Sequence, residues 1–307
     1  MKLNTILRKL NTCLNDPKVI PLKFVYKLSP MIKDDKFYLK ILFPLKTGYI
    51  LNLNKPVTYN EKMQWLKINY RHEIMHTMVD KYEVKNFAKE IIGEEYIVPT
   101  YGVWDSFEEI NFNDLPRSFV LKTTHDQGGV VVIKDKYSMD FQKIKNKIEE
   151  HLKTNHYLIS REWPYKGVKP RIMAEALLEN ESLNDLYDYK FYCFHGVPKI
   201  MYIAHGRNKE TCYFDFYDMN FQKLDIERPR YPKSDIKFDI PKNWDLMINL
   251  SIQLSKDFPH LRVDFYNING KIYLGELTFF QGGGLMPFIP QSWDEKMGDF
   301  LNIENLK

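Results

Sequence analysis

The sequence predicts a mixed α/β fold with a helical N-terminal portion, and two observations support this prediction. Aromatic residues make up 15% of the 307 residues, which favours strands over a helical bundle rich in alanine and leucine. The pattern also changes near residue 77. Helical segments interrupted by prolines precede that point, and alternating helix-like and strand-like segments follow it.

The helices are predicted from caps and from apolar periodicity. Before residue 77 the chain is expected to fall into short pieces at its prolines, namely Pro17, Pro21, Pro30 and Pro44. A helix then begins after Thr58, with Thr58 or Asn60 as its cap. Another spans residues 79–92 and ends at Gly93. Later helices are expected around residues 144–152 and 244–256.

The strands are predicted from short apolar runs bounded by turn residues. Residues 118–122 and 130–133 form an expected hairpin around Gly128 and Gly129. A second hairpin joins residues 261–266 to 271–279 through a turn that ends in Asn-Gly. The other expected strands are residues 96–99, 171–178, 189–194 and 199–204.

Composition excludes several classes of protein. A formal charge of +4 is too small to indicate nucleic acid as the main partner. Three cysteines without a Cys-x-x-Cys pair indicate neither a disulfide framework nor a thiolate zinc site. No apolar run approaches the roughly 20 residues of a spanning helix, so we expect a cytoplasmic protein.

The N-terminal stretch from Lys2 to Lys46 is basic, with only Asp16, Asp34 and Asp35 as acidic residues. Leucine, isoleucine and phenylalanine are interleaved with the lysines, as in a segment that contacts an anionic membrane surface. The alternative is an ordinary solvated basic face on the first helices.

The late hairpin carries the most informative polar residues. Strand alternation places Arg262 and Asp264 on one side of the first strand, and Glu276 and Thr278 share a face of the second. Carboxylates beside an arginine suit a hard divalent cation that also binds phosphate oxygens. The run Gln281-Gly-Gly-Gly follows, where a backbone can approach a ligand closely. The alternative is that the two carboxylates only solubilise an edge strand.

A second polar group lies at the earlier hairpin. Lys122 ends an apolar strand and precedes the loop that contains Gly128 and Gly129. An ammonium group beside a glycine loop can hold a polyphosphate through charge and backbone N–H groups. Two glycines in a hairpin can equally be a simple turn.

The string Arg262-Val-Asp-Phe-Tyr, followed by Tyr273-Leu-Gly-Glu-Leu-Thr-Phe-Phe-Gln-Gly, resembles the metal-binding hairpin of ATP-grasp enzymes of the D-alanine–D-alanine ligase kind. The resemblance implies Mg²⁺ held by Asp264, Glu276 and Thr278. This sequence departs from the family pattern at Thr278, where asparagine is usual, and at Gln281, where proline is usual.

Other landmarks of that family follow in the same order. The resemblance implies that ATP is bound by two lysines, a glycine loop, an acidic-apolar linker that contacts adenine and an aspartate: Lys81, Lys122, Gly128, Gly129, Glu175, Leu177, Leu178 and Asp188. It implies catalytic roles in steadying nucleotide and acyl phosphate for Arg262, Arg207 and Lys190.

More closely, the chain from about residue 50 to about residue 300 is similar to the TupA-like ATP-grasp family, whose members are linked to teichuronopeptide, capsule and other surface polysaccharides. The similarity lies in Asn60-Glu-Lys62 with Trp65, Asp80-Lys-Tyr82, Arg161-Glu-Trp163, Asp188-Tyr-Lys190 and Gly275-Glu-Leu-Thr-Phe279. It implies a helical portion over 1–77 and an ATP-grasp domain over 78–307, with nucleotide-clamping lobes at about 95–175 and 186–305.

The expected activity is that of an ATP- and Mg²⁺-dependent ligase that joins a carboxylate to an amine through an acyl phosphate. The family implies an amino acid or similar amine and a carboxylated sugar, such as a uronic acid of a surface polysaccharide precursor. Which partner is phosphorylated is left open.

Two other functions compete with the ligase. His72-Glu-Ile-Met-His76 matches a zinc-peptidase helix, with Glu94 or Glu95 as a third ligand. That alternative leaves the lysines and the late hairpin unexplained. A glycosyltransferase would fit the same pathways, but the sequence has no Asp-x-Asp motif.

Overall fold

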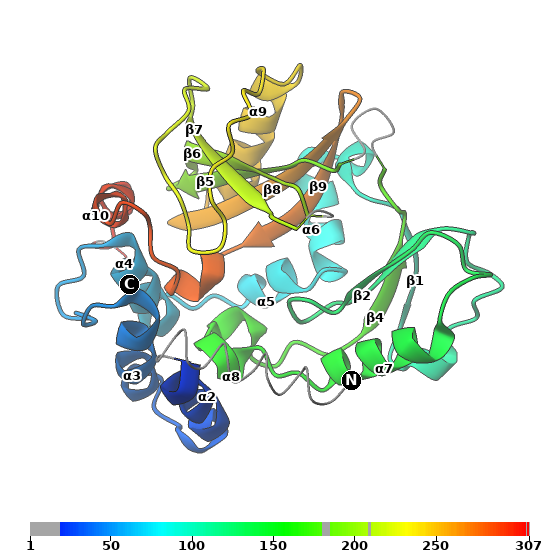
Figure 1. The fold of residues 1–307 in the computed structure, drawn as a ribbon, viewed down its shortest axis with the longest axis horizontal. Helices are drawn as coiled ribbons and strands as arrows, with labels where there is room; N and C mark the ends of the chain where they lie inside the picture. The colour runs from blue at the N-terminus through cyan, green and yellow to red at the C-terminus, as the bar shows by residue number, and fades with distance from the viewer. Residues whose placement is uncertain (1–18, 180–184, 208–209, 305, 307) are drawn as a thin grey trace.

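The computed structural model describes residues 19–179, 185–207, 210–304 and 306. Its N-terminal part is helical: α2 (Val19–Leu28), α3 (Asp35–Thr47), α4 (Tyr59–Asn69) and α5 (Ile74–Val79). Two sheets follow, and α6 (Glu83–Ile92) lies between them (Figure 1). Within the described ranges, no helix is both long and apolar enough to cross a membrane.

Helix α3 corrects the expectation that Pro44 would end a helix. Asp34 caps its start by accepting hydrogen bonds from the backbone N–H groups of Lys36 and Phe37. The helix buries one apolar face and continues past Pro44 to Gly48, which takes a left-handed φ of 90°. Pro44 lies in the last turn, where one lost hydrogen bond costs less than the buried face contributes.

Helix α4 begins as predicted, with Thr58 as its cap. The Thr58 hydroxyl accepts from Glu61 N–H, and the Glu61 carboxylate accepts from Thr58 N–H, which makes a complete capping box. Asn60, the other expected cap, lies inside the helix, and its backbone N–H donates to Asp294 at 2.9 Å.

The helix predicted over 79–92 forms and ends at Gly93 as expected, but it begins only at Glu83, because a break at Asp80 separates α5 from α6. The Asp80 carboxylate accepts from the N–H groups of Tyr82 and Glu83, which starts α6 afresh. Lys81 lies in the break, and its N–H donates to Thr124 O at 3.0 Å. The break therefore turns Lys81 toward the first sheet.

The first sheet has four antiparallel strands in the order β1-β4-β2-β3. They are β1 (Thr100–Trp104), β2 (Phe119–Thr123), β3 (Val130–Ile133) and β4 (Ile172–Glu175). The predicted hairpin of β2 and β3 is confirmed. Helix α7 (Phe141–Leu152), also predicted, packs on β2 through Ile144 and Ile148.

The strand predicted over 96–99 is displaced. A 3-10 helix spans Glu94–Tyr96, and β1 begins only at Thr100, which pairs with Glu175. Pro99 has no N–H to donate, so it cannot extend the ladder; its carbonyl instead accepts from Ala176 N at 2.9 Å.

The second sheet has five antiparallel strands in the order β7-β6-β5-β8-β9. They are β5 (Asp188–Phe194), β6 (Val197–His205), β7 (Tyr213–Asp218), β8 (His260–Ile268) and β9 (Lys271–Thr278). The predicted helix α9 (Trp244–Ser255) covers one face (Figure 1). Strand β7 was not predicted from the sequence.

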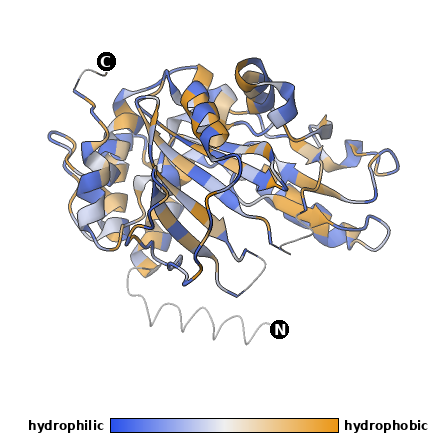
Figure 2. Ribbon diagram, turned by 90° about the horizontal axis from the view of Figure 1, so that it is seen from above, coloured by the Kyte–Doolittle hydropathy of each residue, from blue (hydrophilic) through white to orange (hydrophobic). Residues whose placement is uncertain are grey.

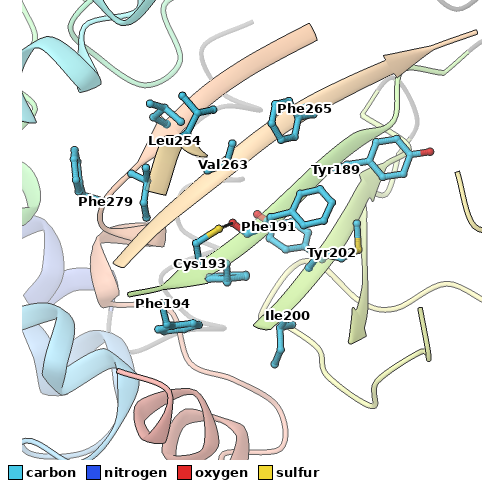
Figure 3. Close-up of a cluster of buried hydrophobic side chains, with 14 of the residues drawn as sticks. Tyr189, Phe191, Cys193, Phe194, Ile200, Tyr202, Leu254, Val263, Phe265 and Phe279 are labelled. Atoms are coloured by element: carbon cyan, nitrogen blue, oxygen red, sulfur yellow. Dashed lines mark hydrogen bonds between the residues drawn. The ribbon is translucent and has the colours of Figure 1, made fainter. Parts of the chain in front are cut away.

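The largest hydrophobic core lies on this second sheet. Phe191 of β5 and Val263 and Phe265 of β8 lie together in it with Leu254 of α9 (Figure 3). Helix α6 contributes Val84 and Ala88 to the same core. Figure 2 shows hydrophobic and hydrophilic residues intermixed along helices and strands, as expected of elements that bury one face. The core therefore fixes α6 and Lys81 relative to β8 and β9.

The remaining short elements connect these parts. They are the 3-10 helices Ser29–Met31, Phe107–Glu109, Trp163–Tyr165 and Gln281–Gly284, and the α-helices α8 (Tyr157–Ser160) and α10 (Ser292–Asp299).

Candidate active site

The β8–β9 hairpin brings four predicted site residues together. Asp264 lies opposite Glu276, and Arg262 lies opposite Thr278. The register shifts next to Asp264, so that Phe265 pairs with Leu274 and Gly275 is the extra residue of a β-bulge. A bulge re-aims the side chains beside it, which here are those of the predicted metal ligands.

Arg262 is the centre of this group. Its Nε and Nη2 each donate to an Asp264 oxygen at 2.6 Å, and Nη2 also donates to Thr278 Oγ1 at 2.9 Å. Glu276 makes a longer contact of 3.5 Å with the same Nη2. Since the Glu276 side chain is 37% exposed, it is the carboxylate of the pair that is most open to a ligand.

The network continues onto β5, the neighbouring strand. The Lys190 ammonium contacts both Asp264 and Asp188, the latter at 2.7 Å. Arg207, which follows β6, contacts Asp188 as well. The predicted residues Asp188, Lys190 and Arg207 are thus joined to the hairpin by a chain of alternating charges.

Pairing with two cationic side chains keeps the buried Asp264 carboxylate ionised. Burial alone raises the pKa of Asp264, but Arg262 and Lys190 outweigh burial and hold that pKa below its ordinary value. Asp264 is therefore an anion that its two cationic neighbours already neutralise, and its affinity for a metal depends on how they rearrange.

The oxygen atoms of this hairpin fit Mg²⁺ that is shared with phosphate groups. Mg²⁺ is commonly held by one or two carboxylates together with nucleotide phosphates, and Asp264 with Glu276 matches that set. Thr278 adds a hydroxyl, but Arg262 donates to it, so its role as a ligand stays a prediction. In the described part of the chain, no three histidine, cysteine, aspartate or glutamate residues form a protein-only metal cluster.

Lysines line the opposite wall of the site, on the first sheet and on α6. Lys122 of β2 forms an ion pair with Glu175 of β4, and Lys85 of α6 contacts the same carboxylate at 2.8 Å. Burial raises the pKa of Glu175, but Lys122 and Lys85 outweigh burial and lower it overall. Lys85 was not predicted, although its position four residues after Lys81 in an expected helix indicates that the two side chains can face one site.

Lys81 joins this wall to the glycine loop. Its ammonium donates to the backbone oxygens of Thr123 and Asp126, the first at 3.1 Å. Burial lowers the pKa of Lys81, while nearby Glu276 acts against that shift. Lys81 also lines the same pocket as Gly275 of β9, the residue next to Glu276.

One pocket lies between the two walls. Lys81, Lys122 and Glu175 line it on one side, and Tyr266 and Gly275 line it on the other. The structure therefore brings the two predicted nucleotide lysines and the late hairpin to the same cleft. More cations than carboxylates line this pocket, which favours an anionic ligand.

The glycine loop is fixed against β2 and α7. Thr123 N–H donates to Gly129 O at 2.9 Å. The buried Asp126 carboxylate accepts from the Thr123 hydroxyl and pairs with His151 at the end of α7. Gly128 has a φ of 108°, which favours glycine. Asp126 and His151 are positioning residues that were not predicted: Asp126 lies in the loop itself, and the His151 contact that fixes it comes from 25 residues further along the chain.

The predicted adenine linker leaves β4 and leads toward β5. Ala176, Leu177 and Leu178 are half-buried there, and Glu175 is the last residue of β4. This placement puts the linker next to the pocket through Glu175. The contact of Leu177 and Leu178 with adenine stays a prediction.

The alternative zinc-peptidase motif at His72–His76 does not form the helix that it would require. His72 precedes α5, which begins at Ile74, and its ring lies 4.4 Å from that of Tyr70. His76 is inside the helix, where its Nδ1 lies 2.6 Å from Pro164 O. The two histidines therefore do not share a helix face, as the motif requires.

A family model described as TupA-like ATPgrasp matches residues 61–302. No curated protein matches. Among solved structures, the chain is 16% identical to D-alanine–D-alanine ligase from Helicobacter pylori, with a TM-score of 0.38, over 80% of this chain and 69% of that one. It is also 16% identical to the Bacillus anthracis enzyme of that name, solved in complex with ATP, with a TM-score of 0.41 over 73% and 65% of the two chains.

Another similar solved structure is N5-carboxyaminoimidazole synthetase from Staphylococcus aureus. This chain is 13% identical to it, with a TM-score of 0.38, over 66% of this chain and 44% of that one. The chain thus spans less than two thirds of the B. anthracis and S. aureus proteins.

Proposed function

Because this chain belongs to the TupA-like ATP-grasp family, we propose that it is an ATP-dependent carboxylate–amine ligase. The observation that carries the proposal is the pocket that Lys81 and Lys122 share with the β8–β9 hairpin. The hairpin residues that line this pocket, Tyr266 and Gly275, belong to the two strands that carry Asp264 and Glu276, so a nucleotide triphosphate bound by the lysines would lie close to the proposed metal ligands.

The proposed reaction has two steps. A substrate carboxylate oxygen attacks the γ-phosphorus of ATP, the bond to the β–γ bridging oxygen breaks, and ADP leaves. An amine nitrogen then attacks the acyl carbon, phosphate leaves, and the nitrogen loses a proton to give the amide. The net reaction consumes ATP, a carboxylate and an amine, and yields ADP, phosphate and an amide.

We assign separate binding roles to the residues in and beside the cleft. Lys81 and Lys122 would neutralise the phosphate chain, and Asp264 and Glu276 would hold Mg²⁺. That ion would supply further neutralisation of the phosphate oxygens. Arg262, Lys190 and Arg207, which contact Asp264 and Asp188 in the structure, would bind the acyl phosphate.

For the substrates, we propose an amino acid or similar amine and a carboxylated sugar of a surface polysaccharide precursor. Support comes from the family, which is linked to such polymers, and from the excess of cations at the pocket. A uronic acid activated as its acyl phosphate is the first choice. An amino acid activated and transferred to an amino sugar is the second. Because ATP is consumed, we also propose that the reaction takes place in the cytoplasm.

The test is a screen for ADP release with amino acids combined with uronic acids or amino sugars, alongside metal analysis of the purified protein. ADP release that needs both an amine and a carboxylate supports the ligase. UDP release from a sugar nucleotide would replace it with a glycosyltransferase. Peptide cleavage with stoichiometric zinc would replace it with a peptidase, against the geometry of His72 and His76.

The Gly129→Ala variant should raise the KM for ATP about tenfold, the size expected when a packed site is forced to shift by 1–2 kcal/mol. A Cβ at Gly129 would lie 2.0 Å from Thr123 Oγ1 and 3.0 Å from Asp126 Oδ1, so the loop must move. The ATP dependence of ADP release measures the change. Adding Thr123→Ala removes the nearest atom and should restore part of the affinity; an unchanged KM in Gly129→Ala would contradict the role of this loop.

A further inference from the structure

Helix α2 presents an apolar face to solvent. Ile20 and Phe24 are 62% and 63% exposed, and their spacing of four residues places them on the same side of the helix. Met31, in the turn that follows α2, is 76% exposed. Single exposed apolar residues are ordinary, but three within 12 residues of chain form a patch.

The opposite side of α2 anchors it to the protein. Val25 is buried, and it packs in one cluster with Leu39 and Leu42 of α3; Leu22 and Tyr26 of α2 lie against the same cluster. The helix is therefore held in place by one face. Its outward residues are not a loose part of that core, because they point away from it.

The exposed face is also basic. Lys27 lies three residues after Phe24 and seven after Ile20, so it shares their side of the helix. Residues 19–46 contain six lysines and only two acidic residues, Asp34 and Asp35. A helix that shows large apolar side chains together with lysines to solvent is typical of proteins that lie in a membrane interface.

We propose that Val19–Met31 is a docking surface for an anionic lipid bilayer, with Ile20, Phe24 and Met31 inserted among the headgroups and Lys27 bound to lipid phosphate or carboxylate groups. This surface is separate from the cleft and does not depend on the ligase chemistry. Docking would hold the cleft close to substrates that are themselves anchored to a membrane.

Charge argues for lipid over two other occupants of the same face. A second copy of the chain would bring lysines against lysines across a two-fold axis, and the like charges would repel. Residues 1–18 are basic as well, with Lys2, Arg8, Lys9 and Lys18 against Asp16, so they would also meet like charge here. An anionic surface meets both the apolar and the basic side chains favourably.

Flotation of the full-length protein with phosphatidylcholine vesicles, with and without phosphatidylserine, tests this proposal. We expect binding that requires phosphatidylserine and weakens as salt rises. Ile20→Ser and Phe24→Ser should each reduce the partition coefficient about tenfold, and Lys27→Glu about fivefold or more. Tyr137→Ser is the matched control, since Tyr137 is 81% exposed but lies between β3 and α7.

The flotation and size-exclusion experiments each have results that would contradict lipid docking. Equal losses in Tyr137→Ser and Phe24→Ser, or no binding to anionic vesicles, would overturn the proposal. A dimer in size-exclusion chromatography that Phe24→Ser dissociates, without vesicle binding, would assign the face to a second copy. ADP release with soluble substrates should be unchanged in all four variants, so a failure of this proposal is separable from a failure of the ligase proposal.

Discussion

Replacing Glu276 with glutamine should reduce the rate of ADP release at least about a hundredfold, while the protein stays folded. One preorganised charge at a phosphoryl-transfer site contributes on the order of 10²–10³ in rate, and Glu276 is the more open carboxylate of the proposed metal pair. Among the residues that the structure describes, its ion-pair contact is the 3.5 Å contact with Arg262. The free energy of unfolding should therefore change by less than about 0.5 kcal/mol.

The experiment measures ADP release against Mg²⁺ concentration, together with urea unfolding of the same samples. Glutamine keeps the size of the side chain but loses the charge that binds a cation, so the variant should need more Mg²⁺ for its residual activity. Glu149→Gln is a surface control, because Glu149 makes a 3.6 Å pair with Lys145 far from the cleft in the fold. Full turnover by Glu276→Gln at ordinary Mg²⁺ would remove Glu276 from the metal site.

The late hairpin could be predicted from sequence because its signals are local. Alternation along β8 and β9 and the Asn-Gly turn determine which side chains share a face, and the structure has Asp264 opposite Glu276. The bulge at Gly275 could not be predicted in this way. It depends on the strand partner, which alternation within one strand does not reveal.

The elements that were missed depend on contacts between distant residues. Strand β7 contains Asp215, a fully buried carboxylate that accepts from His205, Lys223 and Ser234. A charged residue pointing inward breaks the expected strand pattern, and its partners come from elsewhere in the chain. The break at Asp80 is similar, because Lys81 N–H donates to the backbone oxygen of Thr124, the residue that follows β2.

Of the ion pairs that Lys122 and Lys85 form with Glu175, the sequence predicted two of the residues but not the contacts, for the same reason. Lys122 was predicted from its position beside the glycine loop and Glu175 through a family resemblance, and neither argument gave a contact between them. Their ion pair, and the part of Lys85 in it, follow from the pairing of β2 with β4 and from the position of α6. The division of the chain at residue 77 stays a prediction.

The Glu175→Gln variant should lose about 2–3 kcal/mol of stability at pH 7. Removing one partner from a buried ion pair costs about 3–5 kcal/mol, and the value is reduced here because Lys85 and Lys122 keep some exposure to solvent. The change leaves two ammonium groups in the pocket without their shared carboxylate. Urea unfolding of the wild type and the variant measures the difference.

The ion pairs of Glu175 with Lys85 and Lys122 also determine how the stability difference between wild type and variant should depend on pH. The pKa of Glu175 in the folded protein is lower than its ordinary value of about 4.3. Its ionised form therefore contributes full stability above that ordinary value, and the contribution is lost as pH falls through the lower, folded pKa. The wild type should exceed the variant by a constant amount from about pH 7 to pH 5.5 and by less below about pH 4. Because glutamine does not titrate, a difference that grew with acidity would mean that Glu175 is not held as an anion by its lysines.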